Sequence, residues 1–421
     1  MSPSPADALI RYYQAVRTAS VALATPLTVE DQVIQTMRDV SPTKWHLAHT
    51  TWFFETMVLH PHAPDYQSFH PRYRYLFNSY YNAIGPQFRR ARRGVLSRPT
   101  VDDVSRYRRH VDEHLARFLQ EADETTLHAI EPVIRLGLNH EQQHQELTLT
   151  DIKHVFSCNP LRPAYREGTL PAAGTCPPQS WRGFPEQLAW IGHAADAFAY
   201  DNESPRHRVW LDAFELGSRL VTNGEFITFI ADRGYERPEL WLSDGWDAVC
   251  DRRWTAPLYC ERDGGGWCVM TLAGMQDLDP ASPVCHVSFF EADAFARWAG
   301  ARLPTEAEWE IAAAAEPIEG NFLERRRLHP AAAAADAPDC GVRQLFGDVW
   351  EWTASPYVAY PGYRPATGAL GEYNAKFMSN QMVLRGGSCA TPQSHIRGTY
   401  RNFFPPGARW QFSGLRLARH T

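Results

Sequence analysis

The character of this sequence changes near residue 157, and the change limits the folds that the chain can adopt. Before this point glycine is sparse and apolar residues recur at helical spacing, as in the face that contains Leu9, Tyr13 and Val16. After it, short apolar runs alternate with turns rich in glycine, proline and aspartate. A length of 421 residues suits two or three domains. We therefore predict an α+β multidomain protein whose first half is helical.

The predicted domain limits follow this change in composition. Residues 1–157 contain four helical stretches, which predicts a four-helix bundle. Residues 158–185 are rich in proline and glycine and lack periodicity, so we interpret them as a linker. Residues 186–421 predict short strands and long loops with two short helices. We predict approximate limits for four helices, near 101–120, 128–156, 222–233 and 289–299.

Composition excludes several classes of partner. A net charge of −6 and a pI near 6.3 argue against nonspecific binding to nucleic acid or to an anionic membrane. No apolar run predicts a membrane span, and the start MSPSPADALIRYYQ lacks the features of a signal peptide. The eight cysteines are scattered and form no CxxC pair, which favours thiols in a reducing compartment. We expect a cytoplasmic protein.

The string HEQQHQE at residues 140–146 is the most informative in the chain. Histidines at positions i and i+4 lie on one face of a helix, so His140 and His144 can reach one metal ion. The segment HLAH offers His46 and His49 as a third ligand, and spacing leaves that choice open. Three imidazoles suit zinc, copper, iron or nickel and leave positions open for catalysis. The alternative is a set of hydrogen-bonded structural histidines.

The same string matches the HExxH motif of zinc proteases, in which Glu141 would be the general base. One group of them, the gluzincins, needs a further glutamate on a following helix. Here the chain continues into CNPLRPAYREG, which we interpret as linker. This continuation disfavours a zinc metalloprotease, which stays the alternative to another catalytic metal site.

A loop between the histidine-containing stretches predicts a binding site for a small acid. Tyr80 and Tyr81 are adjacent, and an arginine cluster follows them. Its members are Arg89, Arg90, Arg92 and Arg93. Arginine binds carboxylates with two parallel hydrogen bonds, and a tyrosine near a metal can donate a proton or an electron. The alternatives are an exposed basic turn and two aromatic rings that only pack.

Long strings in both halves resemble the EgtB-type ergothioneine sulfoxide synthases. They include SPTKWHLAHTTWFFET, YLFNSYYNAIGP, HEQQHQELTLTDIKH, GEYNAKFMSNQ and RNFFPPGARWQFSGLRLAR. The resemblance implies an N-terminal DinB-like bundle that carries the metal and a C-terminal C-type-lectin-like domain of the formylglycine-generating-enzyme type. It also implies an Fe(II)- and O2-dependent enzyme. That enzyme would join the sulfur of cysteine or γ-glutamylcysteine to the imidazole C2 of Nα-trimethylhistidine (hercynine), forming a sulfoxide in ergothioneine biosynthesis.

The resemblance also assigns roles to residues of this chain. As iron ligands it implies His49, His140 and His144, and as the catalytic tyrosine Tyr81 or Tyr80, with Tyr81 favoured. It implies that Gln143 binds the imidazole of trimethylhistidine. For the carboxylate of the sulfur donor it implies Arg90, assisted by Arg89 or Arg93. For the trimethylammonium group, which aromatic walls bind well, it implies Trp410, Gln411 and Phe412.

Two related activities are alternatives to this function. Ovothiol-type 5-histidylcysteine sulfoxide synthases act on histidine itself and typically carry an added methyltransferase domain, for which this chain has no room. A formylglycine-generating enzyme would need a second cysteine after Cys389 for its copper site, and none follows. The sequence therefore favours the ergothioneine pathway over both.

Overall fold

The computed structural model describes residues 4–170, 174–194, 196–334 and 341–421, which form two compact units. The helical unit comprises the chain up to Tyr165 together with Asp196–Phe198 and Ala366–Tyr373. The mixed unit comprises Arg166–Ala195, Ala199–Pro365 and Asn374–Thr421.

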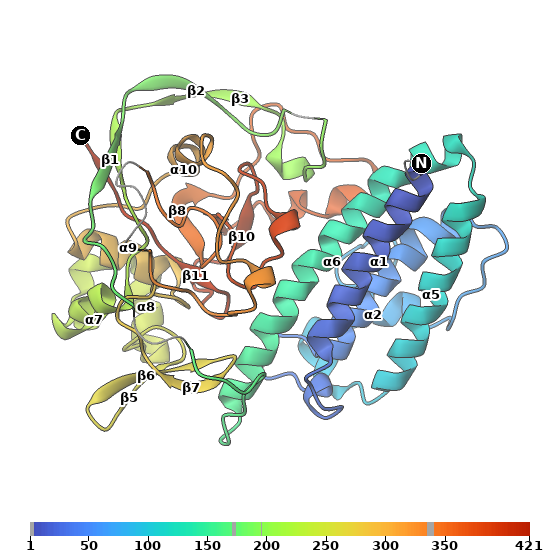
Figure 1. Cartoon of the computed structure of the whole chain (residues 1–421), viewed down its shortest axis with the longest axis horizontal. Helices are drawn as coiled ribbons and strands as arrows, with labels where there is room; N and C mark the ends of the chain where they lie inside the picture. Colours follow the sequence, from blue (N-terminus) through green and yellow to red (C-terminus); the bar gives the residue numbers. More distant parts are fainter. Residues whose placement is uncertain (1–3, 171–173, 195, 335–340) are drawn as a thin grey trace. The chain divides into compact units, whose positions relative to one another are not determined.

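Four long helices form the core of the helical unit. They are α1 (Pro5–Ala24), α2 (Thr43–Phe54), α5 (Val101–Glu121) and α6 (Glu124–Cys158). Figure 1 draws α1, α2, α5 and α6 in colours from blue to teal. Helix α2 continues through a π-helical turn, Glu55–Leu59, into α3 (His60–His62), and the short α4 (Tyr73–Leu76) follows. The face of α1 that contains Leu9, Tyr13 and Val16 is buried. The predicted four-helix bundle is confirmed.

Local sequence fixes where these helices begin. Thr100 and Asp103 form a capping box at the start of α5, in which each side chain accepts a hydrogen bond from the other residue's backbone N–H. The side chain of Asp123 accepts a hydrogen bond from the Thr126 N–H at the start of α6. Such caps satisfy backbone donors that have no partner inside the helix.

Helix α2 is buried along its whole length and lies very close to α6. Gly137 allows this approach, because a Cβ atom there would lie 2.6 Å from Phe54 Cε1 and 2.7 Å from Phe53 Cε1. Packed interiors do not tolerate such overlap without movement of the helices. The absence of a side chain at this position therefore sets the distance between the two helices that carry the histidines.

A buried ionic cluster around Glu141, the residue after His140, links the helices of the bundle. Arg17 Nη1 on α1 and Arg108 Nη2 on α5 each donate to the Glu141 carboxylate over 2.8 Å. Arg17 Nη2 also donates to Thr51 Oγ1 on α2 at 2.9 Å. Burial raises the pKa of Glu141, but the two guanidinium charges outweigh burial and lower that pKa to about 2. The carboxylate is therefore ionised at any working pH.

We expect Glu141→Gln to lower the free energy of unfolding by about 3–5 kcal/mol at pH 7, because it leaves buried arginine charge without its partner. The pKa of Glu141 is depressed from 4.5 to about 2. Its contribution to stability is therefore complete above pH 4.5 and is lost as the pH falls toward 2. Denaturant unfolding at several pH values measures both effects.

The matched control is Glu131→Gln on the same helix, where Glu131 forms an exposed ion pair with Arg135. An exposed pair of this kind contributes less than about 1 kcal/mol. Equal effects of the two substitutions would contradict the structural role assigned to Glu141.

The described residues of the mixed unit form four small sheets joined by long loops. The largest has the strand order β10-β9-β8-β11, with β8 parallel to β11 and the other pairs antiparallel. Strands β1-β4-β12 form an antiparallel sheet, β2-β3 a hairpin and β5-β6-β7 a meander. The strands are β1 (Trp181–Phe184), β2 (Gln187–Ile191), β3 (His207–Leu211), β4 (Phe214–Gly217), β5 (Cys260–Asp263), β6 (Gly266–Thr271), β7 (Gly274–Asp277), β8 (Trp350–Pro356), β9 (Met382–Arg385), β10 (Asn402–Phe404), β11 (Ser413–Gly414) and β12 (Ala418–His420).

In the described part of this unit, four α-helices accompany the strands. They are α7 (Asn223–Ala231), α8 (Ser243–Arg252), α9 (Phe289–Trp298) and α10 (Glu306–Ala313). Capping boxes start three of them, at Thr222, Ser288 and Thr305. The helices predicted near 222–233 and 289–299 are thus present as α7 and α9.

Buried arginine–carboxylate pairs hold the loops of the mixed unit in place. Arg416 donates to Glu351 at 2.8 Å, and both side chains are fully buried. Similar pairs join Arg401 to Glu306, Arg397 to Glu203, Arg409 to Glu291 and Arg385 to Glu310. A planar guanidinium can satisfy a carboxylate and several backbone carbonyls at once, which suits a core made largely of loops.

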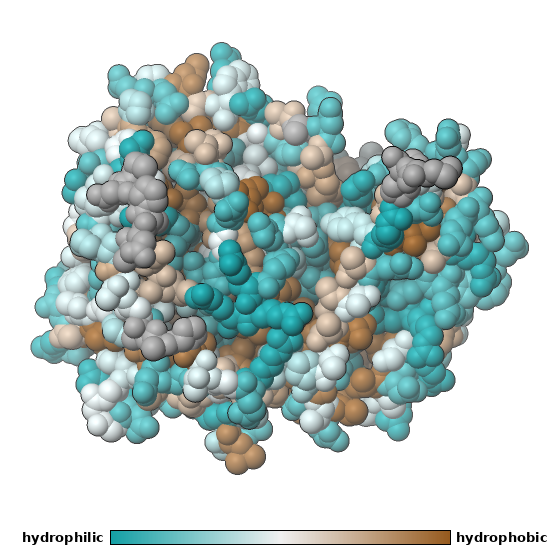
Figure 2. Space-filling model, in the orientation of Figure 1, coloured by the Kyte–Doolittle hydropathy of each residue, from teal (hydrophilic) through white to brown (hydrophobic). Residues whose placement is uncertain are grey.

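Three further observations concern the surface and the chemistry of the whole chain. Among the described cysteines there is no disulfide, and Cys340 lies outside the described residues. In the part of the chain that the structure describes, no helix has both the length and the apolar character needed to cross a bilayer. On the face drawn in Figure 2, hydrophobic residues are dispersed among hydrophilic ones.

Candidate metal centre

Three histidines from two helices meet inside the helical unit. His49 on α2 and His140 and His144 on α6 each place a ring nitrogen so that the three atoms lie within 4.8 Å of one another. The Nε2 atoms of His49 and His140 are 3.2 Å apart. Two imidazole nitrogens bound to one metal ion at about 2.1 Å lie about 3.0–3.5 Å apart. The spacing therefore fits ligands of a single ion.

The remaining ring nitrogens show how the three imidazole rings are oriented. His49 Nδ1 lies 2.6 Å from the backbone carbonyl of Phe77, an acceptor, so this nitrogen donates and Nε2 keeps its lone pair. His140 Nδ1 is buried and, among the described residues, has no hydrogen-bond partner. A purely structural histidine would avoid that cost. His46 is not one of the three and instead contacts His144 Nδ1 at 2.8 Å.

Electrostatics keep the three imidazoles neutral. Burial lowers the pKa of His49 and of His144 well below 6.5, and the neighbouring imidazoles lower both further. Burial likewise lowers the pKa of His140 to about 3, although the carboxylate of Glu141 opposes this shift. Neutral imidazole is the form that binds metals. The set of donors is thus ready to bind a cation at neutral pH.

Aromatic rings fix the orientation of His49. Trp45 stacks on it with ring centroids 4.6 Å apart and an interplanar angle of 14°, and Trp52 stacks at 5.6 Å. Arg93 Cζ lies 3.3 Å from the centroid of the Trp45 ring, a cation–π contact. His49 therefore belongs to a stack of aromatic rings that ends at the guanidinium group of Arg93.

The arginine cluster divides into exposed and buried members. Arg89 and Arg90 are exposed, and Arg90 donates to the backbone carbonyl of Asp39 at 2.6 Å. The 3-10 turn Arg90–Val95 directs Arg93 inward, where its Nη1 donates to Ser41 Oγ at 2.8 Å. Within the described part of the chain, no carboxylate forms an ion pair with Arg93. A buried cation of this kind can bind an anionic ligand.

The adjacent tyrosines lie one aromatic ring away from the histidines. The rings of Tyr80 and Tyr81 stack with centroids 4.6 Å apart. Burial raises the pKa of Tyr80, so its phenol stays protonated at neutral pH. Tyr81 is fully buried against Trp52, at a ring distance of 5.5 Å, and Trp52 in turn stacks on His49.

Two residues at this centre were missed by reasoning from the sequence. The hydroxyl of Tyr373 donates to Gln143 Oε1, and its ring centroid lies 5.5 Å from that of His140. The carboxylate of Glu372 accepts hydrogen bonds from the backbone N–H groups of Asn82, at 3.0 Å, and Ala83, at 2.7 Å. The string GEYNAKFMSNQ was the only signal that could have indicated them.

Glu141 does not belong to this centre, although it follows His140 directly. Its carboxylate is engaged by Arg17 and Arg108 in the ionic cluster. Successive residues of a helix are rotated by about 100°, so a neighbour of a ligand can face another direction. An ionised carboxylate held by two arginines is a poor general base. The structure gives no support to the protease alternative.

The three predicted residues near the C-terminus lie in the mixed unit. Phe412 is fully buried, with its ring centroid 4.9 Å from that of His286, and Trp410 packs against Phe404 at 5.9 Å. Gln411 is buried, and neither polar atom of its amide has a hydrogen-bond partner within the described residues. An unmatched buried amide in a protein core requires a reason, and a ligand would be one.

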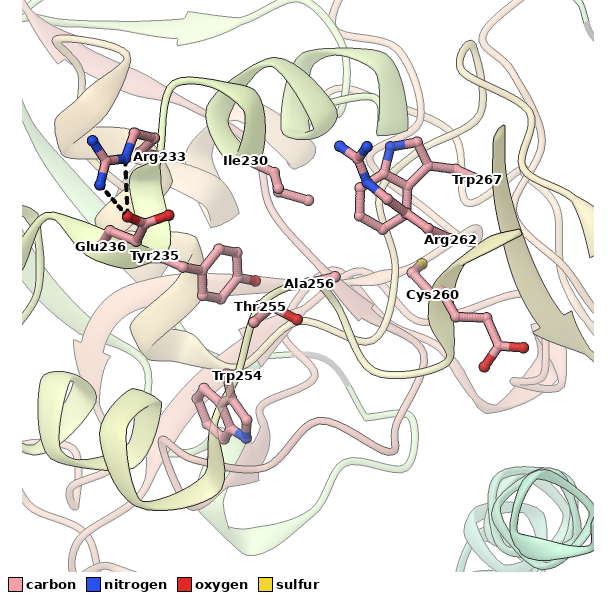
Figure 3. A pocket seen from close by; sticks show the side chains of 11 residues that line it. Ile230, Arg233, Tyr235, Glu236, Trp254, Thr255, Ala256, Cys260, Arg262 and Trp267 are labelled. Carbon is pink, nitrogen blue, oxygen red and sulfur yellow. Dashed lines mark hydrogen bonds and ion pairs between the residues drawn. The ribbon is translucent and has the colours of Figure 1, made fainter. Parts of the chain in front are cut away.

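A separate cavity of about 520 Å³ lies in the mixed unit, as Figure 3 shows. Tyr235, Trp254 and Trp267 contribute to its walls, and none of the predicted site residues lines it. Arg233 is paired with Glu236 at 2.9 Å, and Tyr235 donates to Glu291 at 2.5 Å. These polar groups are thus matched within the protein, and the cavity lacks the cluster of donors found around the three histidines.

Comparisons with known proteins support the two predicted domain types. Residues 12–147 match the DinB superfamily, and residues 188–335 and 324–421 match the sulfatase-modifying factor enzyme 1-like domain. The predicted DinB-like bundle and the domain of the formylglycine-generating-enzyme type are therefore confirmed.

Curated relatives cover most of the chain. The hercynine oxygenase of Mycolicibacterium smegmatis is 33% identical over 415 residues, which span 90% of this chain and 91% of that one. The hercynine oxygenase of Mycolicibacterium thermoresistibile is 36% identical over 313 residues, 67% of each. Ergothioneine biosynthesis protein 1 of Schizosaccharomyces pombe is 28% identical over 240 residues, 53% of this chain and 28% of that one. The chain is an oxygenase and belongs to the hercynine oxygenase family.

Proposed function

We propose that this protein is an Fe(II)-dependent sulfoxide synthase in ergothioneine biosynthesis. It would use O2 to couple the sulfur of cysteine or γ-glutamylcysteine to the imidazole C2 of Nα-trimethylhistidine (hercynine). One observation carries the proposal: the neutral nitrogens of His49, His140 and His144 converge within 4.8 Å. Membership of the hercynine oxygenase family supports the choice of iron and of substrate.

The reaction balances with one molecule of O2. A C–H bond and an S–H bond are lost, and a C–S bond and an S=O bond form. The second oxygen atom leaves as water. Iron held by three histidines would supply open positions for substrates and the redox chemistry that activates oxygen. The protein supplies binding, orientation and proton positions.

Gln143 and Tyr373 form a hydrogen-bonded pair beside His140. We assign Gln143 to binding the imidazole of trimethylhistidine, because it follows His140 by three residues on α6 and therefore lies on the same face of the helix. The Tyr373 hydroxyl fixes which end of the Gln143 amide accepts and which end donates. Tyr81, with Tyr80 stacked on it, is assigned as the residue that holds a proton near the reacting groups.

Among the arginines, Arg93 is the one that the observations favour for the carboxylate of the sulfur donor. It is buried, adjoins the Trp45–His49 stack and lacks a carboxylate partner within the described residues. Arg89 and Arg90 are exposed and are assigned supporting roles in attracting the acid. We assign binding of the substrate that bears the trimethylammonium group to Trp410, Gln411 and Phe412. The support for this assignment is the buried Gln411 amide, which has no hydrogen-bond partner within the described residues.

Of the predictions that test the proposed function, the first concerns the reaction. Protein loaded with Fe(II) without oxygen, then given O2, trimethylhistidine and cysteine or γ-glutamylcysteine, should yield a product with the mass of both substrates plus O2 minus water. Mass spectrometry measures it. A product made from histidine in preference to trimethylhistidine would favour the ovothiol-type alternative. No coupled product with any of these substrates, from protein that binds iron, would contradict the proposal.

The second prediction concerns the metal. Fe(II) should raise the melting temperature of the protein, because it binds only the folded state, and His140→Ala should abolish that shift. The control is His128→Ala, an exposed histidine near the start of the same helix, which should keep the full shift. Calorimetry in the absence of oxygen measures both. An undiminished shift in His140→Ala would show that the ion binds elsewhere.

The third prediction concerns Arg93. Arg93→Met should lower kcat/KM for the sulfur donor about tenfold or more, since hydrogen bonds to charged groups contribute about 1.5–3 kcal/mol. KM for trimethylhistidine should change little. The free energy of unfolding should stay equal or rise, because a buried charge without a carboxylate partner has been removed. Arg89→Met, at an exposed position of the same cluster, is the control.

Unchanged kinetics for the sulfur donor in Arg93→Met, together with a clear loss in Arg89→Met, would transfer the assigned role to the exposed arginines. Steady-state kinetics with each substrate varied in turn separates these outcomes.

A further inference from the structure

A chain of buried hydrogen bonds lies behind the ligand His144. His46 Nδ1 is 2.8 Å from His144 Nδ1, and His46 Nε2 is 3.0 Å from Asp151 Oδ2. The same carboxylate oxygen accepts a hydrogen bond from the Ser41 backbone N–H at 2.7 Å. His46 and Asp151 are only 3% and 2% exposed. The carboxylate is thus held in place from the start of α2, while His46 lies between it and the ligand.

The chemistry of these atoms orders the protons along the chain. A carboxylate oxygen only accepts, so the nitrogen of His46 that faces Asp151 must carry the proton. Neutral His46 then has a lone pair on Nδ1, which can only accept from His144 Nδ1–H. Neutral His144 in turn has its lone pair on Nε2. One carboxylate thereby determines the tautomers of two imidazoles.

The contrast with His49 shows why the carboxylate is needed. His49 faces a backbone carbonyl, Phe77 O, which can only accept, so its tautomer is fixed directly. His144 faces another imidazole, which can donate or accept. Without Asp151, His46 could place its proton on Nδ1 and leave His144 with its proton on Nε2. That arrangement would remove the lone pair from the nitrogen offered to a metal.

We propose that His46 and Asp151 are positioning residues that hold His144 as the Nδ1–H tautomer and so present its Nε2 lone pair to the metal. The inference rests on the proposed metal site for its purpose, but the tautomers themselves can be observed without any metal. Partners of this kind behind a metal-bound histidine typically change metal affinity by 10–100-fold.

The direct test uses metal-free wild-type protein labelled with 15N-histidine. Long-range 1H–15N correlation spectra distinguish a protonated ring nitrogen from a bare one, and His46→Gln and His144→Gln assign the signals. We expect His144 to be protonated on Nδ1 and His46 on Nε2. A His144 ring protonated on Nε2 would overturn the inference, whatever the metal-binding behaviour of the protein.

The second test compares two substitutions at one position. His46→Leu removes the acceptor for His144 Nδ1–H, and we expect it to weaken Co(II) binding by about 10–100-fold. His46→Gln keeps an acceptor and should restore most of that affinity. The control His154→Leu removes a half-buried, hydrogen-bonded histidine of α6, whose ring nitrogen contacts Thr36 Oγ1 at 2.7 Å, and should leave affinity unchanged.

Absorption titration without oxygen measures the affinity, and circular dichroism confirms folding. Wild-type affinity in folded His46→Leu would contradict the inference. If His46→Leu does not fold, the inference is tested by the tautomer spectra and by the Co(II) affinity of His46→Gln. A large loss of affinity in His46→Gln would also contradict the inference. A wild-type protein that binds no metal would refute the proposed function and leave the tautomer test standing.

Discussion

The carboxylate of Glu141 links the helices of the bundle at the residue that follows His140. It binds Arg17 of α1 and Arg108 of α5, and Arg17 also reaches Thr51 of α2. All four long helices are therefore tied together one residue away from His140. Because a helix is rigid about its own axis, fixing the direction of Glu141 also fixes the faces on which the neighbouring histidines lie. The HExxH glutamate thus acts as a structural anchor in this family member.

The close packing of α2 on α6 then sets the distances among the three histidines. Gly137 allows α2 to approach α6, and the buried α2 brings His49 to within 3.2 Å of His140. Burial keeps the imidazoles neutral, which is the form that binds a metal cation. The outer hydrogen bonds, to Phe77 O and along the Asp151–His46 chain, set which nitrogen each ring offers. The packing of the helices and the arrangement of the three histidines therefore depend on the same few contacts.

The sequence predicted the bundle and its helix pair well, because helical periodicity and the spacing of His140 and His144 are local properties. It could not choose between His46 and His49, since both lie on the same helix and only the packing of α2 on α6 assigns them different partners. It could not separate Arg93 from Arg90 either, because the 3-10 turn that buries one of them has no clear signal. Tyr373 was missed because its contact with Gln143 joins residues far apart in the chain.

The central claim is that His49, His140 and His144 together hold one catalytic iron ion. Diffraction at the iron absorption edge, from crystals of Fe(II)-loaded protein grown without oxygen, tests it most directly. The account predicts a single strong anomalous peak within bonding distance of all three imidazoles, with His46 behind His144 and not bound to the ion. A peak bonded to His46 instead of His49, or one located away from these histidines, would contradict it.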